Sequence, residues 1–182
     1  FPALRFLAEA KRDGDFHVPE KVAVLGGGNT AMDAAVTAKR KGATDVYVVY
    51  RRSYAEMPAW PEEKNACLKE GVHFLLLTQP ANYETDNNGC ITGLHVARTE
   101  LGAPDASGRR RPEVLAGSES RLPVQMVVEA LGQELNAAAR NALGELELTE
   151  GGLVKVRQDS QQTSAADVFA GGDIVNGGTT AV

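Results

Sequence analysis

The spacing of hydrophobic residues changes along the chain and separates predicted helices from predicted strands. Residues 3–12 place apolar side chains at helical spacing. Two runs, 21–25 and 45–50, are continuous, apolar and rich in valine, which is typical of strands buried on both faces of a parallel sheet. The segment between them is rich in alanine and ends in basic residues, which predicts a helix over 31–41. Together these segments predict a βαβ unit.

The rest of the chain predicts one more long helix and several strands. Pro61, followed by two glutamates, is typical of a helix start, and we expect this helix to end at Glu70. Further apolar or alternating segments predict strands at 72–77, 91–101, 125–131 and 167–170. The polar segment 102–120 predicts a long surface loop. The expected fold is α/β and Rossmann-like: a mostly parallel sheet flanked by helices, with a small antiparallel insertion at about 80–124.

Composition narrows the possible partners. The 182 residues are 43% hydrophobic and 24% charged, as in ordinary globular proteins. The net charge of −5 argues against nucleic acid as a partner, and the apolar runs are too short to predict a membrane span. The two cysteines, Cys67 and Cys90, form no CxxC pair or metal-binding cluster, and the three histidines lack metal-ligand spacing. We therefore predict no metal site and expect a reducing, cytoplasmic setting.

A glycine-rich turn gives the strongest chemical signal. The segment 26–31 reads GGGNTA, a G-x-G-x-x-A pattern between a predicted strand and a predicted helix, as a dinucleotide-binding loop requires. Gly26 permits the tight turn, Gly28 lets the backbone approach a pyrophosphate, and Ala31 keeps the helix close to the sheet. The expected cofactor-binding residues of this loop are Gly26, Gly27, Gly28, Asn29 and Thr30.

Two arginines at the end of the second strand indicate which dinucleotide binds. An NAD site has a carboxylate about 20 residues after the glycine loop, where it accepts hydrogen bonds from the ribose hydroxyls. Here the strand is followed by Arg51 and Arg52, and the first carboxylate is Glu56. Guanidinium groups bind phosphate oxygens through paired donors, so a 2′-phosphate suits this position. NADP(H) is therefore expected rather than NAD(H).

Two weaker signals come from glycines that follow apolar segments. Gly172 and Asp173 follow the apolar run 168–170, and Thr179 and Thr180 come after a further pair of glycines. An aspartate there could accept hydrogen bonds from a cofactor's sugar hydroxyls, although a simple turn is an equally good interpretation. The strand at 125–131 runs through Ala130 and Leu131 and breaks at Gly132, where either a ligand or a plain turn would explain the glycine.

Four segments together resemble one family. They are VAVLGGGNTAMD (22–33), VVYRRSYAEMPA (48–59), EALG (129–132) and DVFAGGDIVNGGTTAV (167–182). They are similar to the NADPH-binding domain of the glutamate synthase small (β) subunit and to the related flavin-containing half of dihydropyrimidine dehydrogenase. The resemblance implies an NADPH domain inserted into an FAD domain, whose flavin passes electrons through iron–sulfur clusters to a partner domain or subunit.

The resemblance also implies roles for individual positions. Gly27 to Thr30 would contact the NADPH pyrophosphate and ribose, and Arg51 and Arg52 would hold the 2′-phosphate. Ala130, Leu131 and Gly132 would lie along the nicotinamide. Gly172 and Asp173 would meet the ribitol and phosphates of FAD, with Thr179 and Thr180 near the flavin ring. We name no catalytic acid or base, because hydride transfer between cofactors needs none and the sequence points to none.

The same resemblance divides the chain into three parts. Residues 1–20 would be a linker and first helix from the FAD domain, 21–134 the NADP(H)-binding domain, and 135–182 a C-terminal stub of the FAD domain. The sequence contains no second G-x-G-x-x-G unit for FAD and no iron–sulfur cysteines. We therefore expect this chain to be a fragment that does not bind FAD tightly alone.

Three functions are compatible with these residues. The favoured one is the electron-input domain of an FAD-dependent, NADPH-linked oxidoreductase. A disulfide reductase resembling thioredoxin reductase is a second, although the sequence has no CxxC pair. The third is an NADP-sensing module without redox turnover. The final electron acceptor is not encoded in this stretch.

Overall fold

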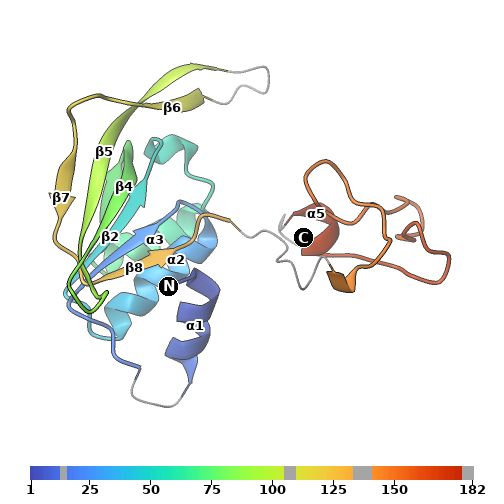
Figure 1. Cartoon of the computed structure of the whole chain (residues 1–182), viewed down its shortest axis with the longest axis horizontal. Coiled ribbons are helices and arrows are strands. Elements are labelled where there is room, and N and C mark those ends of the chain that lie inside the picture. Colours follow the sequence, from blue (N-terminus) through green and yellow to red (C-terminus); the bar gives the residue numbers. More distant parts are fainter. Residues whose placement is uncertain (13–15, 105–109, 133–140, 178–182) are drawn as a thin grey trace. The chain divides into compact units, whose positions relative to one another are not determined.

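The computed structural model of the chain describes residues 1–12, 16–104, 110–132 and 141–177 (Figure 1). They form two compact units, Phe1–Leu131 and Gly132–Val182. The helices of the first unit are α1 (Ala3–Lys11), α2 (Asn29–Arg40) and α3 (Pro61–Lys69), with a 3-10 turn η1 (Tyr54–Glu56). Its strands are β1 (Lys21–Leu25), β2 (Asp45–Tyr50), β3 (His73–Leu76), β4 (Thr78–Thr85), β5 (Ile91–Pro104), β6 (Arg110–Val114), β7 (Ser120–Leu122) and β8 (Met126–Glu129).

A four-stranded parallel sheet organises the first unit. Its strand order is β3-β2-β1-β8, and the register pairs Leu25 of β1 with Val49 of β2 on one side and with Glu129 of β8 on the other. The chain therefore builds outward from β1 to β3 and then returns to the opposite side of β1. In open α/β sheets, ligands bind beyond the carboxyl ends of the strands where the strand order reverses in this way.

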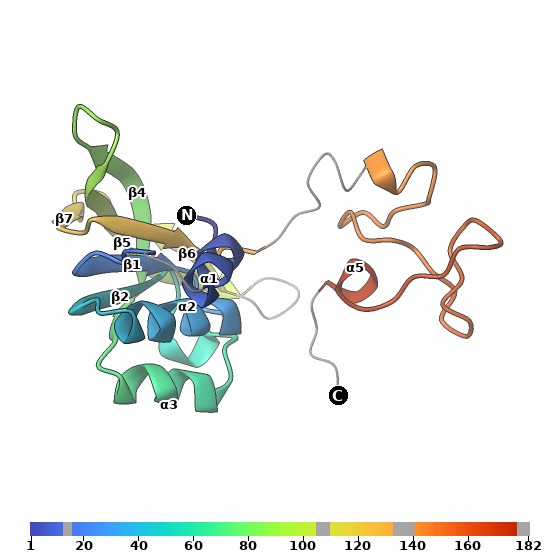
Figure 2. The ribbon, with the colours of Figure 1, turned by 90° about the horizontal axis from the view of Figure 1, so that it is seen from below.

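Both faces of the parallel sheet are covered. In β1, Val22 and Val24 pack with residues of α1, α2 and α3, whereas Ala23 and Leu25 pack on the other face against β5 and its neighbours. Figure 2 shows these layers, with α2 and α3 below the parallel sheet and β4 above it. Burial on two faces explains why β1 is continuously apolar rather than alternating. The expected α/β fold is confirmed.

The second sheet is antiparallel, and only its long strand β5 was predicted individually as a strand. β5 pairs with β4 and β7 along its first half and with β6 along its second half. Residues 102–120 were expected to be a surface loop, and this is wrong because β5 continues to Pro104 and Arg110–Val114 forms β6. The side chains of β6 are mostly exposed, so the hairpin carries no apolar alternation from which a strand could be predicted.

The second unit has little regular structure. Residues 167–170 do not form the expected strand: only Phe169 makes a bridge, to Gln162, and a second bridge joins Leu148 and Val154. The short helix α5 (Asp173–Asn176) lies between Gly172 and Gly177, which both have positive φ angles. The expected domain boundary at 134/135 lies outside the described residues, and the assignment of the three parts stays a prediction. No helix in the described part of the chain is both long and apolar enough to cross a membrane.

Candidate dinucleotide-binding site

Strand pairing brings the glycine loop, the two arginines and Ala130 to one edge of the parallel sheet. The Gly26 amide donates to the Val49 carbonyl (3.1 Å), and the Ala130 amide donates to the Leu25 carbonyl (2.8 Å). The loop therefore leaves β1 between the carboxyl ends of β2 and β8. Of the predicted cofactor residues, this edge holds Gly26, Gly27, Gly28, Asn29, Thr30, Arg51, Arg52, Ala130 and Leu131.

The three glycines of the loop are required for different reasons. Gly26 has a φ of +131°, and a Cβ there would collide with the Ala130 carbonyl oxygen. A Cβ on Gly27 would lie 2.6 Å from the ring of Tyr50. A Cβ on Gly28 would meet nothing within 4 Å. Packing inside the protein thus accounts for the first two glycines, whereas Gly28 borders open space into which a ligand can bring its phosphates close to the backbone.

Helix α2 begins at this loop. Gly28 is its N-cap and has no side chain to accept a hydrogen bond, so the amides of Asn29 and Thr30 have no acceptor within the helix. These amides and the positive end of the helix dipole suit an anion. The side chain of Thr30 is exposed, whereas the Asn29 side-chain oxygen already accepts a hydrogen bond from the Trp60 amide (2.9 Å). The backbone amide and the side-chain NH2 group of Asn29 are the donors that it can offer to a cofactor.

The two arginines follow β2 directly, and sheet contacts hold their backbone. Thr99 Oγ1, from β5, donates to the Arg51 carbonyl (2.8 Å), and the Leu77 amide donates to the Arg52 carbonyl (3.0 Å). The side chain of Arg51 is exposed, and that of Arg52 is partly buried. Arg52 Nε is buried and has no hydrogen-bond partner among the described residues. A buried donor without an acceptor is costly, so this position fits an anionic group that supplies one.

The segment between β2 and α3, residues 51–60, is called the arginine loop below. Several contacts of this loop were not predicted as parts of the site. The Tyr50 hydroxyl donates to the Glu56 carbonyl (2.9 Å), and the Ala59 amide donates to the Gly27 carbonyl (3.0 Å). Ser53 and Glu56 form a capping box at η1, in which the Ser53 amide donates to the Glu56 carboxylate (3.1 Å). The S-x-x-E pattern at 53–56 was visible in the sequence and could have predicted this turn. The contacts of Tyr50 with Gly27 and Glu56 depend on the folded structure, and no local sequence pattern predicts them.

A hydrogen-bonded pair of polar side chains, Tyr83 and Glu129, lies at the end of β8. Tyr83 on β4 donates a hydrogen bond to the carboxylate of Glu129, the residue before Ala130. Burial and this hydrogen bond raise the pKa of Tyr83 to about 12, so the hydroxyl remains a neutral donor at physiological pH. A small cavity of about 180 Å³ is lined there by Phe1, Tyr83, Ile91, Val127 and Glu129.

The second unit holds the remaining predicted residues. Gly132 begins this unit and has a φ of +110°. Gly172 has a φ of +73°, and the exposed Asp173 follows it as the first residue of α5. Thr179 and Thr180 lie outside the described residues. Within the described part of this unit, no buried polar side-chain atom lacks a partner, so no observation here indicates an FAD site. FAD binding by the full-length protein stays a prediction.

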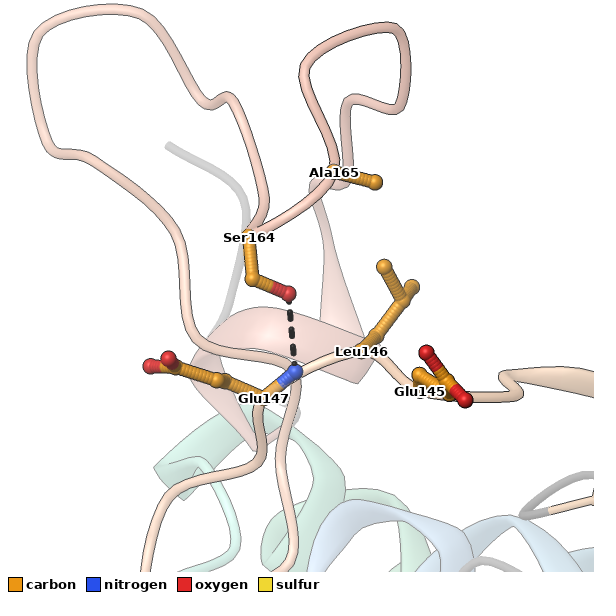
Figure 3. A pocket seen from close by; sticks show the side chains of 5 residues that line it. All are labelled: Glu145, Leu146, Glu147, Ser164 and Ala165. Atoms are coloured by element: carbon orange, nitrogen blue, oxygen red, sulfur yellow. Dashed lines mark hydrogen bonds between the residues drawn. The ribbon is translucent and has the colours of Figure 1, made fainter.

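A separate hollow lies within the second unit. Figure 3 shows its lining, which consists of Glu145, Leu146, Glu147, Ser164 and Ala165 around a volume of about 320 Å³. The Glu147 amide donates to Ser164 Oγ (3.0 Å), which holds the two segments together. Two carboxylates border this hollow, and they would repel phosphate groups. It is therefore a poor candidate for the dinucleotide.

Possible metal ligands and the buried Cys67 thiol were compared with what metal or thiol chemistry requires. They contain no group of three or more histidine, cysteine, aspartate or glutamate side chains able to hold a metal ion. The buried Cys67 has its pKa raised to about 11, first by burial and then by the nearby carboxylates of Glu63 and Asp33. A thiol with so high a pKa is a poor nucleophile at neutral pH.

Comparison with known proteins identifies the family. The family model of the pyridine nucleotide-disulphide oxidoreductases matches residues 2–182. The chain belongs to this family.

Two relatives are similar to most of this chain in sequence. The chain is 42% identical over 182 residues to the NADP(+)-dependent formate dehydrogenase subunit beta of Moorella thermoacetica, covering all of this chain and 25% of that protein. It is 42% identical over 161 residues to the glutamate synthase [NADPH] small chain of Escherichia coli K12, covering 87% of this chain and 34% of that one. The expected resemblance to the glutamate synthase small subunit is confirmed. The chain spans only about a quarter to a third of these relatives.

Two solved structures share the fold of this chain. The FprA protein of Mycobacterium tuberculosis in complex with NADPH superimposes with a TM-score of 0.73 at 16% identity, covering 99% of this chain and 54% of FprA. The thioredoxin reductase of T. acidophilum gives a TM-score of 0.68 at 18% identity, covering 91% of this chain and 48% of that one. At these identities the likeness supports the architecture alone.

Proposed function

We propose that this chain is the NADP(H)-binding part of an NADPH-dependent flavoprotein oxidoreductase similar to the glutamate synthase small subunit. The observation that carries the proposal is the pair Arg51 and Arg52 at the carboxyl edge of β2, where Arg52 Nε is buried without an acceptor. The names of two relatives, which include NADP(+) and NADPH, support the same cofactor.

The geometry suggests how the cofactor would lie. Its pyrophosphate would meet the open backbone at Gly28 and the first amides of α2, because both features suit an anion. Its 2′-phosphate would supply the acceptor that Arg52 lacks, with Arg51 contributing a second positive charge. Its nicotinamide would extend along Ala130 and Leu131, beyond β8 on the other side of β1.

The residues of this chain bind and orient the cofactor rather than react. NADPH supplies the hydride when it is bound, and no side chain has to move a proton at the nicotinamide for that transfer. Placing the dinucleotide across the switch point of the sheet fixes the distance and direction of the reacting carbon. We further propose that the acceptor is an FAD held mainly by sequence outside this chain, with iron–sulfur partners beyond it and a cytoplasmic location.

Removing both guanidinium groups tests the cofactor assignment. Arg51→Ala with Arg52→Ala should weaken NADPH binding by roughly 2–4 kcal/mol, because charge-assisted hydrogen bonds to phosphate are lost. NADH binding should be nearly unaffected, since NADH has no 2′-phosphate. Isothermal titration calorimetry with both cofactors measures the two affinities.

A second arginine pair provides the matched control. Arg110 and Arg111 lie on β6, where Arg110 bonds to the carbonyls of Leu101 and Gly102. Arg110→Ala with Arg111→Ala changes the net charge equally and should leave both affinities unchanged. Equal losses for NADPH and NADH in the Arg51 and Arg52 variant would contradict the proposal.

A further inference from the structure

Tyr50 stands between the glycine loop and the arginine loop. It is the last residue of β2 and is partly buried. Its ring lies against Gly27, where any Cβ would come within 2.6 Å of the ring carbon Cε2. Its hydroxyl donates to the Glu56 carbonyl (2.9 Å), at the far end of the loop that begins with the arginines. One side chain therefore contacts both halves of the candidate site.

The charge of Arg52 also reaches the Tyr50 hydroxyl. Burial raises the pKa of Tyr50, and the neighbouring positive charge of Arg52 opposes that rise. The hydroxyl is thus protonated at neutral pH and donates its proton to the Glu56 carbonyl, which closes the loop that carries Arg52. Arg52 itself has a buried donor atom, Nε, without a hydrogen-bond partner among the described residues, so no hydrogen bond at that atom fixes the guanidinium.

We propose that Tyr50 is a positioning residue that orients Arg52 and thereby sets the preference for NADPH over NADH. This inference rests on the proposed function and identifies a residue that acts through Arg52. The ring supports the Gly27 backbone and serves both cofactors equally. The hydroxyl holds the arginine loop through its hydrogen bond to the Glu56 carbonyl, and this contributes only to binding of the 2′-phosphate. Preorganising a flexible guanidinium in this way lowers the entropy lost on binding.

Removing the hydroxyl alone separates these two roles. Tyr50→Phe keeps the ring against Gly27 but loses the hydrogen bond to the Glu56 carbonyl. NADPH affinity of the full chain should fall about three- to tenfold, the range for one neutral hydrogen bond, while NADH affinity should change less than about twofold. Tyr47→Phe, on the same strand and stacked on His73, is the matched control and should change neither affinity.

A double-mutant cycle adds a readout that a merely structural role would not give. In an Arg52→Ala background, Tyr50→Phe should cause no further loss of NADPH affinity, because the hydroxyl acts through the missing guanidinium. Equal losses for NADPH and NADH, or additive losses in the cycle, would overturn the inference. No change in NADPH affinity on Tyr50→Phe would overturn it as well. A wild-type chain that does not prefer NADPH would instead refute the proposed function, which makes the two failures distinguishable.

Discussion

At the scale of single residues, neighbouring glycines in one loop serve different purposes. Gly26 and Gly27 have no room for a side chain, because the Ala130 carbonyl and the Tyr50 ring already occupy that space. Gly28 has room, and its φ of −88° is accessible to any residue. A glycine that the fold does not require points to a requirement imposed by a ligand.

Alanine substitutions can separate these purposes. Gly28→Ala should change the free energy of unfolding by less than about 1 kcal/mol but weaken NADPH and NADH binding alike, since its methyl group enters the space for the pyrophosphate. Gly26→Ala should lower the free energy of unfolding by about 1–3 kcal/mol, because it combines a positive φ with a backbone clash. Urea denaturation and calorimetry measure the two effects. Normal cofactor binding by Gly28→Ala would show that the loop meets no ligand there.

At the scale of elements, the antiparallel sheet supports the cofactor edge of the parallel one. Thr99 of β5 is buried. Its hydroxyl donates a hydrogen bond to the Arg51 carbonyl, and its amide donates one to the Leu77 carbonyl. Leu77 joins β3 to β4 with a φ of +48°, an uncommon conformation for a leucine. Its amide in turn bonds to the Arg52 carbonyl. The arginine loop is thus anchored at two consecutive carbonyls, one to β5 of the second sheet and one to the Leu77 link between β3 and β4.

Removing one anchor should loosen the arginines. Thr99→Val is nearly isosteric but leaves the Arg51 carbonyl without its donor, so the free energy of unfolding should fall by about 1–2 kcal/mol. NADPH affinity should fall more than NADH affinity. Thr92→Val, in the same strand, breaks a bond to Glu84 instead and serves as the control. An unchanged ratio of the two affinities in Thr99→Val would contradict this role of the sheet.

Local patterns in the sequence predicted the parallel sheet well and the antiparallel one only in outline. Strands 21–25 and 45–50 were predicted at their observed bounds because burial on two faces leaves an unbroken apolar run. The hairpin of β5 and β6 was missed because its polar side chains face solvent. The glycine and arginine motifs were visible in the sequence, since each reflects local chemistry. The contacts of Tyr50 and Thr99 depend on the tertiary fold, and no local pattern could have predicted them.

At the scale of the whole molecule, the two units differ in how much hydrophobic core each contains. The first unit contains two hydrophobic clusters, one on each face of the parallel sheet. Among the described residues of the second unit, only Val154 and Thr163 are buried. Its exposed apolar side chains include Phe169 at 62% exposure. Burial on this scale cannot offset the conformational entropy of ordering the segment.

Separating the units tests this contrast. Residues 1–131 expressed alone should unfold cooperatively and bind NADPH as the full chain does, because the predicted phosphate contacts all lie within them. Residues 132–182 alone should show no cooperative transition. Circular dichroism during thermal unfolding, with calorimetry for the cofactor, measures both. Loss of cofactor binding by 1–131 would show that the second unit contributes to the site.

The contact between Trp60 and Asn29 has a practical consequence. Trp60 is the only tryptophan of the chain, its side chain is partly exposed, and its backbone is tied to the first turn of α2. Indole emission overlaps the absorption band of reduced nicotinamide, so energy transfer from this single fluorophore offers a label-free optical signal beside the glycine loop. The oxidised cofactor lacks that band, and the same signal therefore distinguishes the two redox forms as they bind.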